Sequence, residues 1–93
     1  MKYLLAAALI ALPVLAAPAA AECFVEYKAK RDDPLQLHYG VIRLSDGECA
    51  DPGPAVARRI GRDGWQLLTV MGKLSASEAE KRRNDAGAYF LRY

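Results

Sequence analysis

The chain has little of the chemistry on which most enzymes depend. Among its 93 residues there are one histidine, two cysteines and one tryptophan. Catalysis by a nucleophile and a general base needs a partner for each role, and no spacing in the sequence gives His38 such a partner. Gly47 and Gly53 are isolated glycines, so no glycine-rich loop is present to cradle a phosphate. We therefore expect a protein that is not an enzyme and that uses no cofactor and no metal.

Carboxylates paired for acid and base work are not evident either. The candidates Asp32, Asp33, Asp46 and Asp51 all lie in turn-like sequence, where aspartate commonly bonds to its own backbone. The formal net charge of the whole chain is only +2. A nucleic-acid partner is therefore not expected.

Two short basic clusters stand out against this near-neutral background. The first consists of Arg58, Arg59 and Arg62, and the second is the run 81–83. Both fall in predicted helices, where such clusters usually form a solvated face. The functional alternative is a basic patch for an anionic partner, either lipid headgroups or an acidic protein face. The sequence leaves membrane contact by these helices open.

The first 21 residues have the organisation of a secretory signal peptide. Lys2 precedes an apolar stretch over 3–12, and two prolines lead to a small-residue run that ends at Ala21. This order predicts cleavage after Ala21, which leaves 22–93 as one small domain. Residues 3–21 are uncharged and long enough for a membrane anchor, so retention is the alternative. We expect an exported protein, and the pattern favours the periplasm of a bacterium.

Cys23 and Cys49 are the only cysteines, and in an exported chain two thiols most simply form one disulfide. Such a bond closes a loop of about 26 residues, which is worth about 3–4 kcal/mol in the chain-entropy model. A metal site with His38 and a redox thiol are the alternatives, and neither has the C-x-x-C spacing that would favour it. A lipid anchor on Cys23 is disfavoured because Glu22 precedes it where a small residue is needed.

The first half of the mature chain predicts a β-hairpin. Residues 24–30 alternate between apolar and charged side chains, which is typical of a half-buried strand. The run 31–34 has turn residues, and 35–44 is again rich in β-branched and aromatic residues. Gly40 within this second strand indicates a bulge or a close backbone approach.

The second half predicts a packed helix, a strand, an exposed helix and a last strand. A helix over 54–62 has a narrow apolar stripe that can pack on the sheet. Residues 65–71 form the most apolar run and predict a central strand, with Trp65 in the core. Ser75 and Glu78 have capping-box spacing, which favours a short solvated helix over 76–83. Residues 88–93 predict a final strand.

Together these elements predict an α+β fold. We expect a small three- or four-stranded, mainly antiparallel sheet with one packed helix, one short exposed helix and one disulfide. Apolar residues occur on both sides of the predicted strands, so each face of the sheet needs another part of the protein, or a partner, to cover it. The packed helix supplies one cover, so the other side is a candidate partner or ligand surface. Its members are Tyr39, Ile42, Leu44, Tyr89, Phe90 and Tyr93.

This uncovered surface is the basis of the functional prediction. We expect a non-enzymatic accessory or binding module that docks on a larger cell-envelope protein, or on itself, through an apolar sheet face or edge. One alternative is a small-ligand-binding domain with a pocket near Trp65. Another is an unrecognised hydrolase-like enzyme, in which His38 would contact a serine or an aspartate.

Three segments of the mature chain also form a recognisable set: Glu-Tyr-Lys at 26–28, Gly-Trp-Gln-Leu at 64–67 and an aromatic strand at 89–92. In this set the chain resembles a family of small bacterial domains of unknown function, number 4177. The resemblance covers about half of the mature chain and implies an α+β domain with one helix on an antiparallel sheet. It implies no known activity and no catalytic residues. The chain departs from the family in Gln66, in the long segment 31–53, in the cysteine pair and in the export signal.

Overall fold

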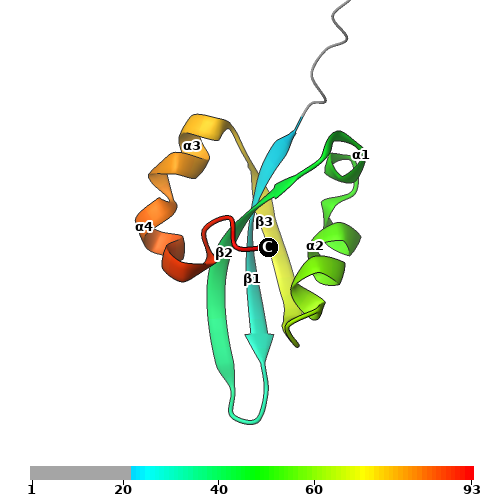
Figure 1. The fold of residues 1–93 in the computed structure, drawn as a ribbon, viewed down its shortest axis with the longest axis vertical. Coiled ribbons are helices and arrows are strands. Elements are labelled where there is room, and N and C mark those ends of the chain that lie inside the picture. The colour runs from blue at the N-terminus through cyan, green and yellow to red at the C-terminus, as the bar shows by residue number, and fades with distance from the viewer. Residues whose placement is uncertain (1–21) are drawn as a thin grey trace, which may run out of the picture.

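The computed structural model describes residues 22–93, so the predicted signal peptide lies outside the described residues. No helix in the described part is both long and apolar enough to cross a membrane. Figure 1 shows the sheet at the centre with helices on either side. The elements, in chain order, are β1 (Cys23–Arg31), β2 (Gln36–Leu44), α1 (Asp46–Cys49), α2 (Pro52–Gly61), β3 (Gln66–Leu74), α3 (Ala76–Lys81), α4 (Arg83–Ala86) and the 3-10 turn η1 (Gly87–Tyr89).

The sheet is antiparallel with the order β2-β1-β3. β1 and β2 pair without interruption from Cys23 opposite Leu44 to Arg31 opposite Gln36, which confirms the predicted hairpin. The predicted α+β fold is also confirmed, with three strands in the sheet. The prediction of a central strand over 65–71 was wrong, because β1 occupies the centre and, among residues 22–93, β3 pairs with β1 alone.

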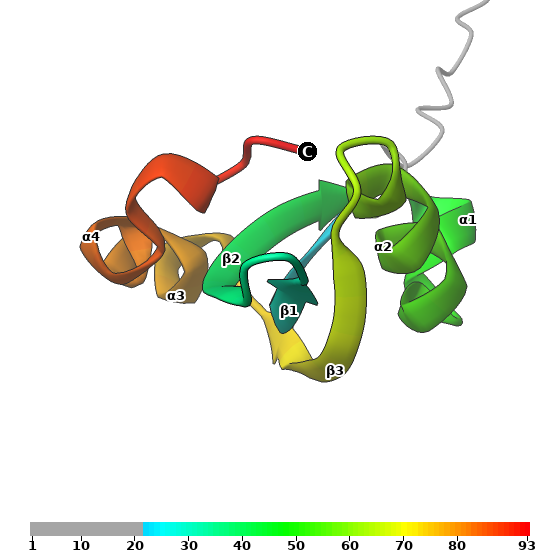
Figure 2. The same cartoon turned by 90° about the horizontal axis from the view of Figure 1, so that it is seen from below.

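One face of the sheet and α2 enclose the main core (Figure 2). The predicted stripe of the helix is confirmed, since Val56 and Ile60 are fully buried, and the helix begins two residues earlier than expected, at Pro52. Gly64 ends this segment in the left-handed region, with a φ of 81°, and Trp65 follows in the core as predicted. The buried members of this core are Val25, Tyr27, Ala29, Ile42, Leu44, Ala55, Val56, Ile60 and Trp65.

A disulfide links Cys23 to Cys49, as predicted, with the two Cα atoms 6.0 Å apart. It joins the first residue of β1 to the last residue of α1. Because the cross-link closes a 26-residue separation, it holds the start of the sheet against the segment that leads into α2.

Gly40 is the position where the sheet admits the Tyr27 ring. The two residues are directly opposite each other in the β1–β2 ladder. A Cβ atom on Gly40 would lie 2.5 Å from the Tyr27 hydroxyl oxygen and 2.6 Å from Cζ. The predicted close approach is therefore confirmed, and only glycine lets this fully buried ring lie against β2.

The second face of the sheet is covered in part by α3, α4 and the residues that follow them. Ala79 and Ala86 are buried against Val41, and Phe24, Tyr39, Leu74 and Phe90 pack around them. The predicted capping box starts α3, since Glu78 N donates to Ser75 Oγ. As predicted, α3 is largely exposed. The exception is Ala79, which is 2% exposed and packs against Val41, so the helix contacts the sheet although the sequence gives it almost no apolar face.

The predicted final strand over 88–93 was also wrong. Gly87 and Leu91 both have a φ of 54°, which turns the chain away from extended geometry. What remains of strand pairing is a single parallel bridge between Val41 and Phe90, with Leu91 N donating to Val41 O at 2.8 Å. The C-terminal segment therefore crosses the sheet near β2 instead of adding a strand (Figure 1).

Candidate functional site

Within residues 22–93 part of the second sheet face has no cover, and here the surface is hollowed. A hollow of about 290 Å³ is lined by Lys28, Ala29, Leu37, His38, Tyr39 and Leu68. Leu37 on β2 is 67% exposed and Leu68 on β3 is 51% exposed. Because α3 and α4 pack farther along this face, around Val41, they leave these leucines open to solvent. We call the region formed by these six lining residues the open hollow.

Strand register explains how the open hollow is built. Lys28 of β1 lies opposite Tyr39 of β2 and opposite Thr69 of β3, so these residues share one face. Ala29 lies opposite His38, and both of these side chains belong to the other face. The backbone of this pair therefore forms the floor, while the side chains of Lys28, Leu37 and Leu68 rise around it.

Two irregularities in β3 decide where Leu68 points. The pairing with β1 shifts between Glu26 and Tyr27 and again between Lys28 and Ala29. The second shift leaves Leu68 without a partner, between Thr69 and Leu67. Leu67 packs into the main core, whereas Leu68 lines the open hollow.

On the opposite side of the sheet, His38 lies in a cluster of aromatic rings. It is 8% exposed. Its ring stacks on Tyr89 with a centroid separation of 3.7 Å and meets Trp65 edge-on at 4.3 Å. His38 Nε2 and the Tyr27 hydroxyl share a hydrogen bond of 2.9 Å. Nδ1 has no hydrogen-bonding partner among residues 22–93.

The electrostatics of this cluster keep both polar rings uncharged at neutral pH. Burial lowers the pKa of His38 from 6.5 to about 4, and the nearby positive charges of Arg31 and Arg92 add to the effect. Burial, with the neighbouring Tyr93 and Tyr89, raises the pKa of Tyr27 above its usual value of 10. A histidine in this state is a weak base, and it has no contact with a serine or an aspartate within the described residues.

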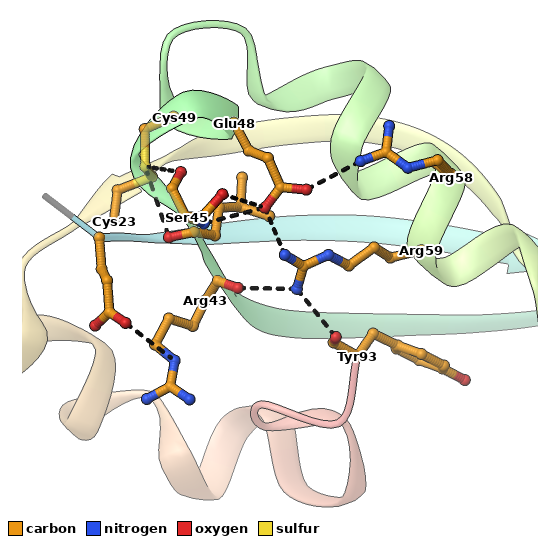
Figure 3. A network of polar contacts seen from close by, with 10 residues as sticks. Cys23, Arg43, Ser45, Glu48, Cys49, Arg58, Arg59 and Tyr93 are labelled. Atoms are coloured by element: carbon orange, nitrogen blue, oxygen red, sulfur yellow. Dashed lines mark hydrogen bonds and ion pairs between the residues drawn. A yellow bond between two sulfur atoms is a disulfide. The ribbon is translucent and has the colours of Figure 1, made fainter. Parts of the chain in front are cut away.

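The predicted basic patch on α2 forms ion pairs within the chain (Figure 3). Arg58 and Arg59 both pair with Glu48, and Arg59 also donates to the backbone oxygens of Arg43 and Tyr93. Hydrogen bonds from Ser45 and the charge of Arg59 lower the pKa of Glu48. Arg62 is exposed and has no ion-pair partner in 22–93. Two of the three arginines therefore join α2 to α1, to β2 and to the C-terminal segment.

The structure separates the six residues predicted as a partner or ligand surface. Ile42 and Leu44 are fully buried under α2, so their assignment to a surface was wrong. The other four are partly buried: Tyr39 and Phe90 pack with α3 and α4, whereas Tyr89 and Tyr93 pack on the main core near His38. Leu37 and Leu68 are surface residues that were not predicted as such. A signal existed for Leu37, which alternates in phase with Tyr39.

Within residues 22–93 no group of three histidine, cysteine, aspartate or glutamate side chains could hold a metal ion. The space beside Trp65, where a ligand pocket was an alternative, is occupied by His38, Tyr89 and the Arg31 guanidinium, which lies 4.1 Å from the Trp65 ring. Comparison with protein-family models, with curated proteins and with solved structures finds no match to this chain. The resemblance to domain family 4177 therefore stays a prediction.

Proposed function

We propose that this chain is a non-enzymatic, exported binding module that docks on a larger cell-envelope protein through the open hollow. The observation that supports this most directly is the exposure of Leu37 and Leu68 on either side of a 290 Å³ depression. Elsewhere, α2 packs on one face of the sheet, and α3 with α4 packs on the other face around Val41. Leu35 and Met71 are also exposed, at 64% and 46%, but they do not line the open hollow. Exposed apolar side chains around a depression are typical of protein interaction sites.

Docking through the face is better supported than docking through the edge of β3. In the described part of the chain β3 pairs only with β1, so its outer edge is open to an added strand. However, the two register shifts interrupt the regular spacing of its backbone groups. Bulges of this kind are a common protection against edge pairing.

The geometry supports the two alternatives less well. A hollow of about 290 Å³ is at the lower limit for enclosing a small ligand. It suits one large side chain of a partner better. A hydrolase would need His38 as a base, but the lowered pKa and the contact with Tyr27 point to a structural role for this residue.

The test is affinity capture of the tagged full-length chain from envelope extract, beside the double variant Leu37→Ser/Leu68→Ser. We expect one stoichiometric partner that the variant fails to retain. Both leucines are more than half exposed, so the variant should fold, which circular dichroism checks. Leu91→Ser is the matched control, because Leu91 is 41% exposed and does not line the open hollow. Equal capture by the double variant and the native chain would refute the proposal.

A further inference from the structure

We infer that the open hollow accepts an acidic segment of the partner protein, in which a large apolar side chain enters the hollow and a neighbouring carboxylate pairs with Lys28. This inference rests on the proposed function and names the chemistry of the partner at that same surface. It follows from the charges around the hollow, from its shape and from what a second copy of the chain would meet there.

Lys28 is the charge on this face that finds no ion-pair partner in the described part of the chain. The other charged residues of β1 on the same face are already engaged: Glu26 accepts from the Tyr39 hydroxyl at 2.7 Å and pairs with Arg82 at 3.6 Å. Lys30 pairs with Asp32 at 3.3 Å. Lys28 is exposed, and no carboxylate of residues 22–93 lies within ion-pair distance of it. It is also the one charged residue among the six that line the hollow.

The shape of the hollow places this cation beside apolar walls. Leu37 rises from β2 and Leu68 from β3, and Lys28 stands on β1 between those strands. The four-carbon stem of a lysine can line an apolar wall while its ammonium group stays in water. A partner side chain seated between the leucines would therefore bring its flanking residues close to the ammonium group. A carboxylate at that position would strengthen binding, whereas a cation would weaken it.

A second copy of the chain fits this surface poorly. Two open hollows brought face to face about a two-fold axis would place Lys28 near Lys28 of the other copy. Like charges at a partly desolvated contact repel each other, and no exposed acidic residue lines the hollow to offset the repulsion. The charge distribution therefore favours a partner of opposite sign over self-association.

The test is selection of random dodecapeptides displayed on phage against the immobilised full-length chain. We expect enriched peptides in which Leu, Phe, Met or Trp stands next to Asp or Glu. The best peptide is then synthesised, and its Kd is measured by fluorescence anisotropy at low and high salt. We expect binding to weaken about threefold in Lys28→Met and about tenfold or more in Lys28→Glu. Salt should weaken binding to the native chain and have little effect on Lys28→Met.

Lys81→Met is the matched control, because Lys81 is an exposed lysine on α3 away from the hollow. The Kd of this variant for the peptide should equal that of the native chain. Two results would overturn the acidic partner while supporting the docking surface. The peptides that Leu68→Ser fails to bind would be basic, or their binding would be unaffected by Lys28→Glu. Peptides unaffected by both changes would refute the docking surface itself. A dimer in sedimentation that Leu68→Ser dissociates would overturn the inference in favour of a second copy of the chain.

Discussion

Protonation of His38 should destabilise the fold in mildly acidic solution. The side chain is 8% exposed, and its pKa is lowered from 6.5 to about 4. The unfolded chain therefore binds a proton more readily than the folded chain between these two values. The stabilising contribution is fully present above pH 6.5 and is lost as the pH falls toward 4. The whole shift corresponds to about 3 kcal/mol, since one pKa unit is worth about 1.36 kcal/mol.

The range from pH 7 to pH 5 is the best one for the measurement. Here the linkage relation gives a loss of about 2 kcal/mol from His38 alone. The carboxylates with perturbed pKa values, Glu48, Glu78 and Glu80, are all shifted below 4.5, so they contribute little above pH 5. The loss should therefore be resolved from general acid unfolding.

Urea unfolding followed by far-ultraviolet circular dichroism at pH 7 and pH 5 measures this loss. Two variants remove the titration: His38→Gln retains an acceptor for the Tyr27 hydroxyl, and His38→Phe retains a ring to stack on Tyr89. Either variant is expected to be less stable than the native chain at pH 7 but to lose about 2 kcal/mol less on acidification.

Because His38 is the only histidine, one NMR titration of its ring protons gives the folded-state pKa without assignment ambiguity. A value near 6.5 would show that burial and the two arginines do not lower the pKa of His38. An equal pH dependence of unfolding in the native chain and in both variants would show the same.

Three further predictions concern the packing. Gly40→Ala should destabilise the fold by about 1–3 kcal/mol in urea unfolding, because its Cβ would lie 2.5 Å from the Tyr27 hydroxyl oxygen. Gly53→Ala, with nothing within 4 Å of the added Cβ, should leave the free energy of unfolding unchanged, and equal effects of the two substitutions would contradict the close packing. Reduction of the disulfide with dithiothreitol should lower the free energy of unfolding by about 3–4 kcal/mol in the same urea assay. An unchanged urea midpoint would show that the cross-link does not restrict the unfolded chain. Ala79→Glu should place a charge against Val41 and lower the free energy of unfolding by about 3 kcal/mol or more. Ser77→Glu, on the exposed side of α3, is the control, and equal stability of the two variants would mean that α3 does not cover the sheet.

The hairpin and α2 could be predicted from sequence because their signals are local. Alternation along 24–30 already decides which face of the strand is buried. The apolar spacing of Val56 and Ile60 does the same for the helix. Gly40 was informative for the same reason, since a glycine inside a strand indicates a contact that no side chain would allow.

Apart from the final strand, which the backbone at Gly87 and Leu91 turns aside, the failures involve contacts between distant parts of the chain. The order of the strands depends on which strands pair with β1. The apolar run in β3 therefore did not indicate that β3 would lie at the edge of the sheet. α3 packs through Ala79, a residue too small to produce an amphipathic pattern. His38 is buried because Tyr89, far along the chain, stacks on it. The open hollow depends on a register shift at Leu68, which interrupts alternation and cannot be inferred from it.

The open hollow exists because α3 and α4 cover only part of the second sheet face. Methyl NMR of the full-length chain with a neutral paramagnetic cosolute measures this cover, because relaxation enhancement reports the exposure of each methyl group. The methyls of Leu37 and Leu68 should be strongly broadened, whereas those of Val41, Ile42 and Leu44, all fully buried, should be protected. Protected methyls at Leu37 and Leu68 would show that the hollow is closed in solution, and accessible ones at Val41 would show that α3 and α4 do not cover the sheet.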